Sequence, residues 1–187
     1  MYCKSPVLCT FFLALLGFSE FLFAAPWSGS GIEGNPYRIA DAADLLALAT
    51  NTDYYDANFI LVNDIDLASA GVFSTAVIAS DIDNSNTVFD GIAFTGSFDG
   101  DGHQITNLTI NGGDNDYLGL FGSISDYTYE DGVVKNLGIA DCNLIGDEYL
   151  GALAGFNGGF VSNCYATGQI VGTNRLGGLM GYNYTGI

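Results

Sequence analysis

A short motif recurs three times in the second half of the chain, and this repetition constrains the fold more than any other feature. LGLFG begins at Leu118, LGALAG at Leu150 and LGGLMG at Leu176. GFNGG around Asn157 likewise returns as GYNYTG around Asn183. A unit of about 27 residues is too small to bury its own apolar face, so successive units must stack on one another as in a solenoid.

The residues between these markers alternate between apolar and polar, which indicates strands rather than helices. Leu108 and Ile110 flank Thr109 in NLTI, and Leu137 and Ile139 flank a glycine in NLGI. Alternation with a period of two is typical of half-buried strands. The 26 glycines also oppose long helices. The sequence therefore predicts an all-β fold, a parallel β-helix with two or three short strands in each coil.

Such a fold places equivalent side chains above one another, about 4.8 Å apart. We expect one inward stack of Leu118, Leu150 and Leu176, and a second of Leu120, Leu153 and Leu179. At one corner we expect a polar ladder of Asn107, Asn136 and Asn163, because Asn tolerates left-handed backbone. We place three glycines at corners that have no room for a side chain: Gly122, Gly155 and Gly181.

The stretch FTGSFDGDGHQITNLTI, residues 94–110, contains the single histidine of the chain, His103. Asp99 and Asp101 flank it, which leaves two interpretations: an acid–base or metal site, or a tight turn. We favour the turn, because the glycines free the backbone and Asp side chains bond to nearby amides. Phe94 and Phe98 would then supply apolar bulk to the core.

Residues 1–25 have the pattern of a secretory signal peptide. Lys4 precedes the apolar run VLCTFFLALLGF, and Ala24 offers a small residue for cleavage. An uncleaved membrane anchor is the rival interpretation. Glu20 interrupts the run, which leaves it short of the roughly 20 residues that span a bilayer. The protein is therefore expected to be secreted or at the cell surface, with no membrane insertion of the mature chain.

The remaining chain divides into three predicted regions. Residues 26–35 read as a flexible leader. Residues 36–93 read as an N-terminal cap with a helix over Ala42–Ala49, capped by Asp41, followed by first strands in NFILVNDIDLA. Residues 94–187 read as the coils, cut short at the C-terminus, so that further repeats or domains are expected to follow.

Charge and cysteine content limit the partners. The net charge is −17, and loss of the signal peptide leaves 20 acids against Arg38, Lys135 and Arg175. Such a surface repels nucleic acid, so no nucleic-acid partner is expected.

Cys142 and Cys164 could pair in an exported protein, but they do not fall at equivalent repeat positions. We expect them to be small buried residues.

No catalytic or cofactor-binding residues are assigned. One histidine excludes an HExxH zinc site within the chain, and no GxSxG turn is present. Calcium is the one cofactor considered. DIDNSNTVFD offers Asp81, Asp83, Ser85 and Thr87 at alternate positions, and GGDNDY offers Asp114 and Asp116, although neither matches a defined calcium loop.

Several segments together resemble the GLUG-motif repeat proteins. They are NPYRIADAADLLALA, NFILVNDIDL, FTGSFDGDGHQITNLTI, YLGLFG, VKNLGI, LGALAGFNGG, VSNCYATGQIVG and LGGLMGYN, and they cover nearly all of residues 35–187. The resemblance implies an exported bacterial, adhesin-like protein with a right-handed parallel β-helix. It supplies no catalytic residues.

The expected function is therefore a non-catalytic scaffold or adhesive module at the bacterial cell surface. An extracellular glycan or protein ligand would bind to exposed strand faces and loops, with Tyr127, Tyr129 and Tyr149 as candidate contacts. The alternative is a fragment of a carbohydrate-active β-helix enzyme, a polysaccharide lyase or glycoside hydrolase. A spacer without any ligand is a third possibility.

Overall fold

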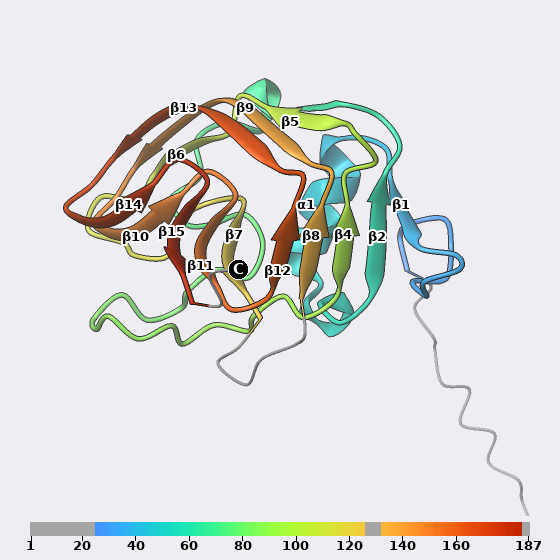
Figure 1. Cartoon of the computed structure of the whole chain (residues 1–187), viewed down its shortest axis with the longest axis horizontal. Helices are drawn as coiled ribbons and strands as arrows, with labels where there is room; N and C mark the ends of the chain where they lie inside the picture. Colours follow the sequence, from blue (N-terminus) through green and yellow to red (C-terminus); the bar gives the residue numbers. More distant parts are fainter. Residues whose placement is uncertain (1–24, 126–131, 185–187) are drawn as a thin grey trace, which may run out of the picture.

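Short parallel strands dominate the computed structural model, which describes residues 25–125 and 132–184 (Figure 1). Within these residues there are one α-helix, α1 (Ala42–Thr50), and two 3-10 helices, Thr52–Tyr54 and Ala68–Ala70. The strands are β1 (Tyr37–Ile39), β2 (Asn58–Leu61), β3 (Ile65–Asp66), β4 (Ser97–Asp99), β5 (Gln104–Thr106), β6 (Thr109–Asn111), β7 (Phe121–Ile124), β8 (Val133–Lys135), β9 (Gly138–Ile145), β10 (Glu148–Gly151), β11 (Ala154–Asn157), β12 (Phe160–Ser162), β13 (Tyr165–Val171), β14 (Asn174–Gly177) and β15 (Met180–Asn183). The predicted signal peptide lies outside the described residues, apart from Ala25.

The strands form four sheets whose members come from successive passages of the chain. Their orders are β1-β2-β4-β8-β12, β10-β14, β15-β11-β7 and β13-β9-β5-β3, with β6 beside β9. All pairings between these strands are parallel, as Figure 1 shows for β2, β4, β8 and β12. The prediction of an all-β fold is confirmed in that the described residues form parallel sheets with few helices.

The leucines of the LG motif stack in the predicted order, but only Leu118 and Leu150 are buried as predicted, whereas Leu176 is 43% exposed. Leu118 pairs with Leu150, and Leu150 pairs with Leu176. The second stack follows from the pairing of the next strands along the chain. Ala154 pairs with Phe121 on one side and Met180 on the other, and a leucine directly precedes each of them. Leu120 and Leu153 are fully buried in the core, and Leu179 packs against it.

The predicted asparagine ladder is correct for two of its three members. The side-chain amide of Asn163 donates to Asn136 Oδ1 at 3.1 Å, and Asn136 donates in turn to Asp99 Oδ1 at 2.9 Å. Asn107 is not part of this ladder. It follows β5 at a different corner and donates to Asp66 Oδ1 at 2.8 Å. All three asparagines have left-handed backbone. The two corners therefore have similar local sequences, and the sequence alone does not distinguish them.

The three glycines predicted at corners lie within strands instead: Gly122 in β7, Gly155 in β11 and Gly181 in β15. A side chain at these positions would nevertheless have no room. A Cβ on Gly155 would lie 2.6 Å from the backbone of Tyr117, and one on Gly122 would lie 2.2 Å from the carbonyl oxygen of Ala79. A neighbouring segment therefore passes directly over the face of these strands.

The turn interpretation of residues 94–110 holds. Asp101 and Gly102 have positive φ, and the His103 N–H donates to the Gly100 carbonyl at 2.8 Å between β4 and β5. Phe94 and Phe98 are fully buried, as expected. Residues 100–103 are thus the turn that connects β4 to β5.

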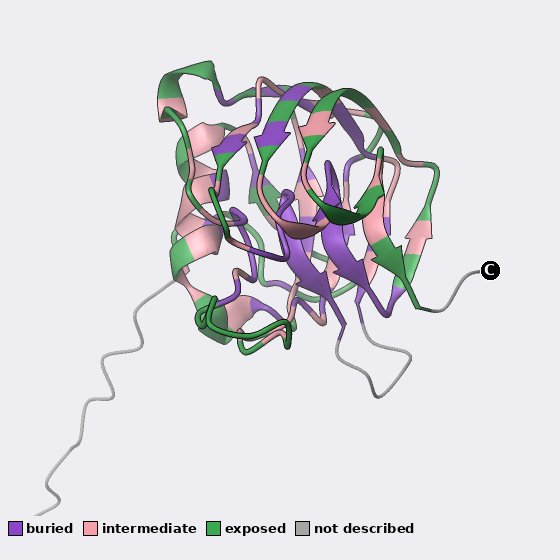
Figure 2. Cartoon of the chain, turned by 90° about the vertical axis from the view of Figure 1, so that its left-hand side faces the viewer, coloured by how far each residue is buried: buried purple, intermediate pink, exposed green. Residues whose placement is uncertain are grey.

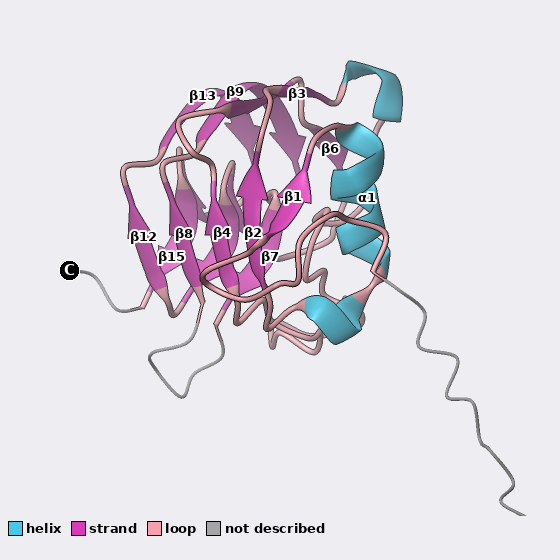
Figure 3. Cartoon of the chain, turned by 90° about the vertical axis from the view of Figure 1, so that its right-hand side faces the viewer, coloured by secondary structure: helices cyan, strands magenta, loops and turns pink. Residues whose placement is uncertain are grey.

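The helix forms where it was predicted and lies at the N-terminal end of the sheets, opposite β12 (Figure 3). Asp41 caps it by accepting a hydrogen bond from the Asp44 N–H at 2.9 Å. Leu45 and Leu48 are fully buried in the core. The helix therefore covers one end of the sheets with its apolar face.

Residues 26–35 are not the flexible leader that their composition predicts. Trp27 is 5% exposed and packs edge-on against Phe59, with ring centroids 5.3 Å apart. Its indole Nε1 donates to the Asp44 carbonyl at 2.8 Å. The predicted boundary between cap and coils at residue 93 also differs from the structure. Strands β1 and β2 lie before it but already belong to the sheet that continues through β4.

We predict that Leu153→Asp will destabilise the fold by about 3–5 kcal/mol, because an unpaired charge would enter a fully buried stack. Urea unfolding followed by circular dichroism measures the change. Val72→Asp is the matched control, because Val72 is 66% exposed and is not a member of this stack. Equal midpoints for Leu153→Asp and the parent chain would contradict the inward assignment.

Candidate functional site

The histidine lies at the surface, paired with one carboxylate. His103 Nδ1 lies 3.0 Å from Asp64 Oδ1, and the Gln104 N–H donates to the same oxygen at 3.1 Å. These two bonds, the backbone one first, lower the pKa of Asp64. The pair joins two neighbouring passages of the chain, and Asp99, one of the two acids that flank His103 in sequence, is engaged elsewhere.

Asp99 belongs to the corner ladder rather than to a histidine site. Burial by itself would raise the pKa of Asp99, but hydrogen bonds from Asn136 and the Asp101 N–H outweigh it. Lys135 Nζ adds an ion pair 3.2 Å from Asp99 Oδ2. The pKa of Asp99 is therefore lowered, and the carboxylate stays charged to hold two passages of the chain together.

The oxygen-rich segment 81–90 uses its side chains mainly on its own backbone. Asp81 Oδ1 accepts from the N–H groups of Ile82 and Asp90 at 2.9 and 2.8 Å, and Asp83 Oδ1 accepts from the Ser85 N–H at 3.0 Å. Among residues 25–125 and 132–184, no three His, Cys, Asp or Glu side chains form a group that could hold a metal ion. Calcium binding by this segment stays a prediction.

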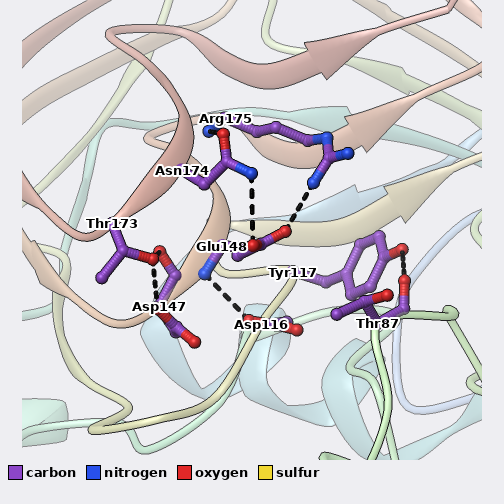
Figure 4. A network of polar contacts seen from close by, with 8 residues as sticks. All are labelled: Thr87, Asp116, Tyr117, Asp147, Glu148, Thr173, Asn174 and Arg175. Carbon is purple, nitrogen blue, oxygen red and sulfur yellow. Dashed lines mark hydrogen bonds and ion pairs between the residues drawn. The ribbon is translucent and has the colours of Figure 1, made fainter.

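The fold brings Asp116 into a network that crosses three repeats (Figure 4). Asp116 Oδ1 accepts from the Glu148 N–H at 2.8 Å. The Glu148 carboxylate in turn accepts from Asn174 Nδ2 at 3.2 Å and forms an ion pair with Arg175. Asp147 accepts the hydroxyl of Thr173 beside it. The acids of one repeat are therefore neutralised or hydrogen-bonded by the next.

Burial raises the pKa of Asp116, and the negative charges of Asp147, Glu148 and Asp81 raise it further. The hydrogen bond from the Glu148 N–H opposes this only in part. Asp81 is itself 5% exposed, and its Oδ2 atom has no hydrogen-bond partner. The structure thus brings together two acids, Asp81 and Asp116, that the sequence places in separate loops.

Tyr149, a predicted ligand contact, has both faces of its ring covered. The ring stacks on Tyr117 with centroids 4.4 Å apart and planes 8° apart. The Arg175 guanidinium lies over Tyr149, 4.6 Å from its centroid. Tyr117, Tyr149 and Arg175 occupy equivalent positions of successive repeats, each with left-handed backbone. Tyr127 and Tyr129, the other predicted contacts, lie outside the described residues.

A cavity of about 480 Å³ lies between the 3-10 helix Thr52–Tyr54, the loop that ends near Ala93, and strands β7 and β11. Tyr55 and Phe89 provide aromatic surface in its wall, and Asp53 and Asp56 provide exposed carboxylates. The lining also includes apolar residues and four residues with hydroxyl groups: Thr52, Thr95, Ser123 and Ser125. No lining residue that the structure describes carries a positive charge. Sequence reasoning missed this site, because its residues come from segments without a shared motif.

The two cysteines of the coils are free thiols. Cys142 is buried, whereas Cys164 is partly exposed, so the prediction of small buried residues holds for Cys142. Burial raises the pKa of both thiols. No helix in the described part of the chain is long and apolar enough to cross a membrane.

The curated proteins that this chain matches are much longer than it is. No protein-family model matches. Halomucin from Haloquadratum walsbyi is 35% identical over 157 residues, which are 83% of this chain and 2% of halomucin. A "Putative Gly-rich membrane protein" from Evansella cellulosilytica is 35% identical over 144 residues, 72% of this chain and 15% of that protein. The chain therefore spans a small fraction of the curated relatives that it matches.

Among solved structures, the fold is similar to a "putative immunoglobulin A1 protease from Bacteroides ovatus", with a TM-score of 0.46 and 22% identity. The similarity covers 83% of this chain and 47% of that one.

We predict that Asp116→Asn will stabilise the protein at neutral pH. The folded pKa of Asp116 is raised, so the folded state loses stability as pH rises from the ordinary value of 3.8 through the folded pKa. The amide keeps an acceptor for the Glu148 N–H and removes the buried charge. Thermal unfolding at pH 4 and pH 7 measures the effect.

The gain in melting temperature should be large at pH 7 and small at pH 4. Asp114→Asn, an exposed change two residues away, is the control and should give no such pH-dependent gain. A gain for Asp116→Asn that is the same at both pH values would contradict this electrostatic account.

Proposed function

We propose that the chain is part of an exported, non-catalytic scaffold at the cell surface, folded as a right-handed parallel β-helix of GLUG-type repeats. The observation that carries this proposal is the residue-for-residue parallel pairing of successive repeats, seen in the Leu118, Leu150 and Leu176 stack. The names of the relatives, halomucin and a membrane protein, favour a surface location. A stack of this kind can be lengthened by adding repeats, which suits a spacer or display structure.

We further propose that the scaffold binds a neutral, polyhydroxylated ligand, such as one or two sugar rings, in the cavity beside Asp53. Its volume of about 480 Å³ is in the range of small-molecule sites. Aromatic surface from Phe89 suits the apolar face of a sugar, and carboxylates suit its hydroxyl groups as acceptors. Acidic sugars are disfavoured, because Asp53 and Asp56 would repel their carboxylates without a cation to offset them.

We predict that the protein binds neutral glycans and not uronic-acid polymers in a glycan panel followed by titration calorimetry. Asp56→Ala and Phe89→Ala should each weaken binding about tenfold or more, through the loss of a charged acceptor or of aromatic contact. Asp114→Ala is the control: Asp114 is an exposed acid that does not line the cavity. Binding that survives both cavity variants would disprove the assignment of this site.

The same panel separates the proposal from the enzyme alternative. Soluble products with new reducing or unsaturated ends would indicate a carbohydrate-active enzyme. Absence of both binding and turnover would leave the scaffold without a ligand and would contradict the binding part of the proposal.

A further inference from the structure

A smaller cavity of about 150 Å³ lies next to the cavity beside Asp53 and shares part of its wall. Thr52, Tyr55 and Ile92 line both. We call the cavity beside Asp53 the large lobe and its neighbour the small lobe. Four further residues complete the lining of the small lobe: Ala49, Ala79, Ser80 and Ile82. The two cavities are therefore adjacent parts of one binding region.

Hydrogen bonds of Tyr55 hold the wall of the small lobe in place. Tyr55 is 4% exposed, and its hydroxyl donates to the Ala49 carbonyl at 3.3 Å and accepts from the Ala79 N–H at 3.0 Å. Ala49 belongs to the last turn of α1, whereas Ala79 precedes the loop that carries Ile82. One buried side chain thus joins the segments that line this lobe, so the lobe exists before any ligand arrives.

The two lobes differ in chemistry. Asp53 and Asp56 give the large lobe two carboxylates. None of the seven residues that line the small lobe, all of them in the described part of the chain, carries a charge. Four of them are aliphatic: Ala49, Ala79, Ile82 and Ile92. The small lobe therefore suits an apolar group more than a hydroxyl-bearing ring.

Two of the aliphatic side chains are unusually accessible. Ile82 is 77% exposed and Ile92 is 59% exposed. In Figure 2 buried residues gather on strands in the middle of the stack, and exposed residues mark the loops. Most exposed residues between Ile82 and Val88 are polar, so the isoleucine at the lobe stands out. A ligand that covers both isoleucines would remove apolar surface from water.

The size of the small lobe limits what can enter it. Its volume of about 150 Å³ is below the roughly 300 Å³ at which pockets for whole small molecules begin. It therefore fits a substituent rather than a second ring. An acetamido group offers a methyl to the aliphatic wall, and its carbonyl and N–H can bond to the hydroxyls of Thr52 and Ser80.

We propose that the small lobe binds the acetamido group of an N-acetylated amino sugar whose ring occupies the large lobe. This inference rests on the proposed glycan site and names the class of sugar that the site prefers. An N-acetylated sugar is neutral, so it meets the requirement that the carboxylates of Asp53 and Asp56 impose on the large lobe.

Titration calorimetry on the full chain tests this with two probes, the β-1,4-linked trimers of N-acetylglucosamine and of glucose. We expect the N-acetylated trimer to bind about tenfold tighter or more, because one small apolar group in a matching pocket supplies that much discrimination. Ile82→Ser should remove most of this preference and leave the affinity for the glucose trimer unchanged, since Ile82 lines only the small lobe. Val88→Ser is the matched control, because Val88 is 56% exposed on the same loop and lines neither lobe.

A variant that fills the small lobe gives a second, independent measurement. Ala49→Leu places extra methyl groups in the lobe, so it should abolish the preference for the N-acetylated trimer while the glucose trimer still binds. Ala47→Leu, a change of the same size in the same helix at a residue that lines neither lobe, should keep the preference. Binding of the glucose trimer by Ala49→Leu also shows that this variant is folded.

The two probes separate failure of this inference from failure of the glycan site. If neither trimer nor any other glycan binds the parent chain, the glycan site is wrong and the acetamido assignment falls with it. Equal affinities of the parent chain for the two trimers, or a preference that survives in both Ile82→Ser and Ala49→Leu, would overturn the assignment of the small lobe and leave the glycan site standing.

Discussion

Parallel hydrogen bonding between successive repeats is the interaction on which the rest of this structure depends. Each short strand satisfies its backbone groups only through the passages before and after it, since strands of three or four residues have little stability alone. Pairing in register puts like residues over like residues, and the register shifts only between Ala166 and Gly168 of β13 among the paired strands of the described residues. The apolar stacks, the asparagine amide bonds and the aromatic stack all follow from that alignment.

Register also explains why unusual backbone conformations repeat. Tyr117, Tyr149 and Arg175 all have left-handed φ, which costs energy for residues with a side chain. The segment that bends in this way passes over glycines such as Gly155, where a Cβ would clash. Stacking of the two tyrosine rings and the guanidinium offsets part of the cost. A left-handed bend of the backbone in one repeat therefore requires the same bend in the next repeat.

Features that recur in the sequence could be predicted, whereas contacts between unlike segments could not. The leucine stacks followed from the LG motif, and the helix from Asp41 and its apolar spacing. Asn107 was misplaced because NLTI resembles NLGI, although the register pairs Lys135 with Asp99 and sets Asn107 at another corner. Trp27 was missed because a Gly- and Ser-rich segment gives no local sign that one aromatic ring will be buried. The cavity beside Asp53 joins segments that share no pattern, so only three-dimensional placement reveals it.

The distribution of acids along the stack gives the molecule a strong electric asymmetry. Among residues 25–184 the acids all lie at or before Glu148, so that part of the stack is the highly negative end, whereas residues 149–184 carry only the charge of Arg175. In dilute salt the negative end dominates how two molecules approach, through long-range repulsion. In brine of about 1 M the Debye length shrinks to about 3 Å, and that repulsion reaches no farther than a single side chain. Concentrated salt therefore removes most of the long-range repulsion between the acidic surfaces of two molecules.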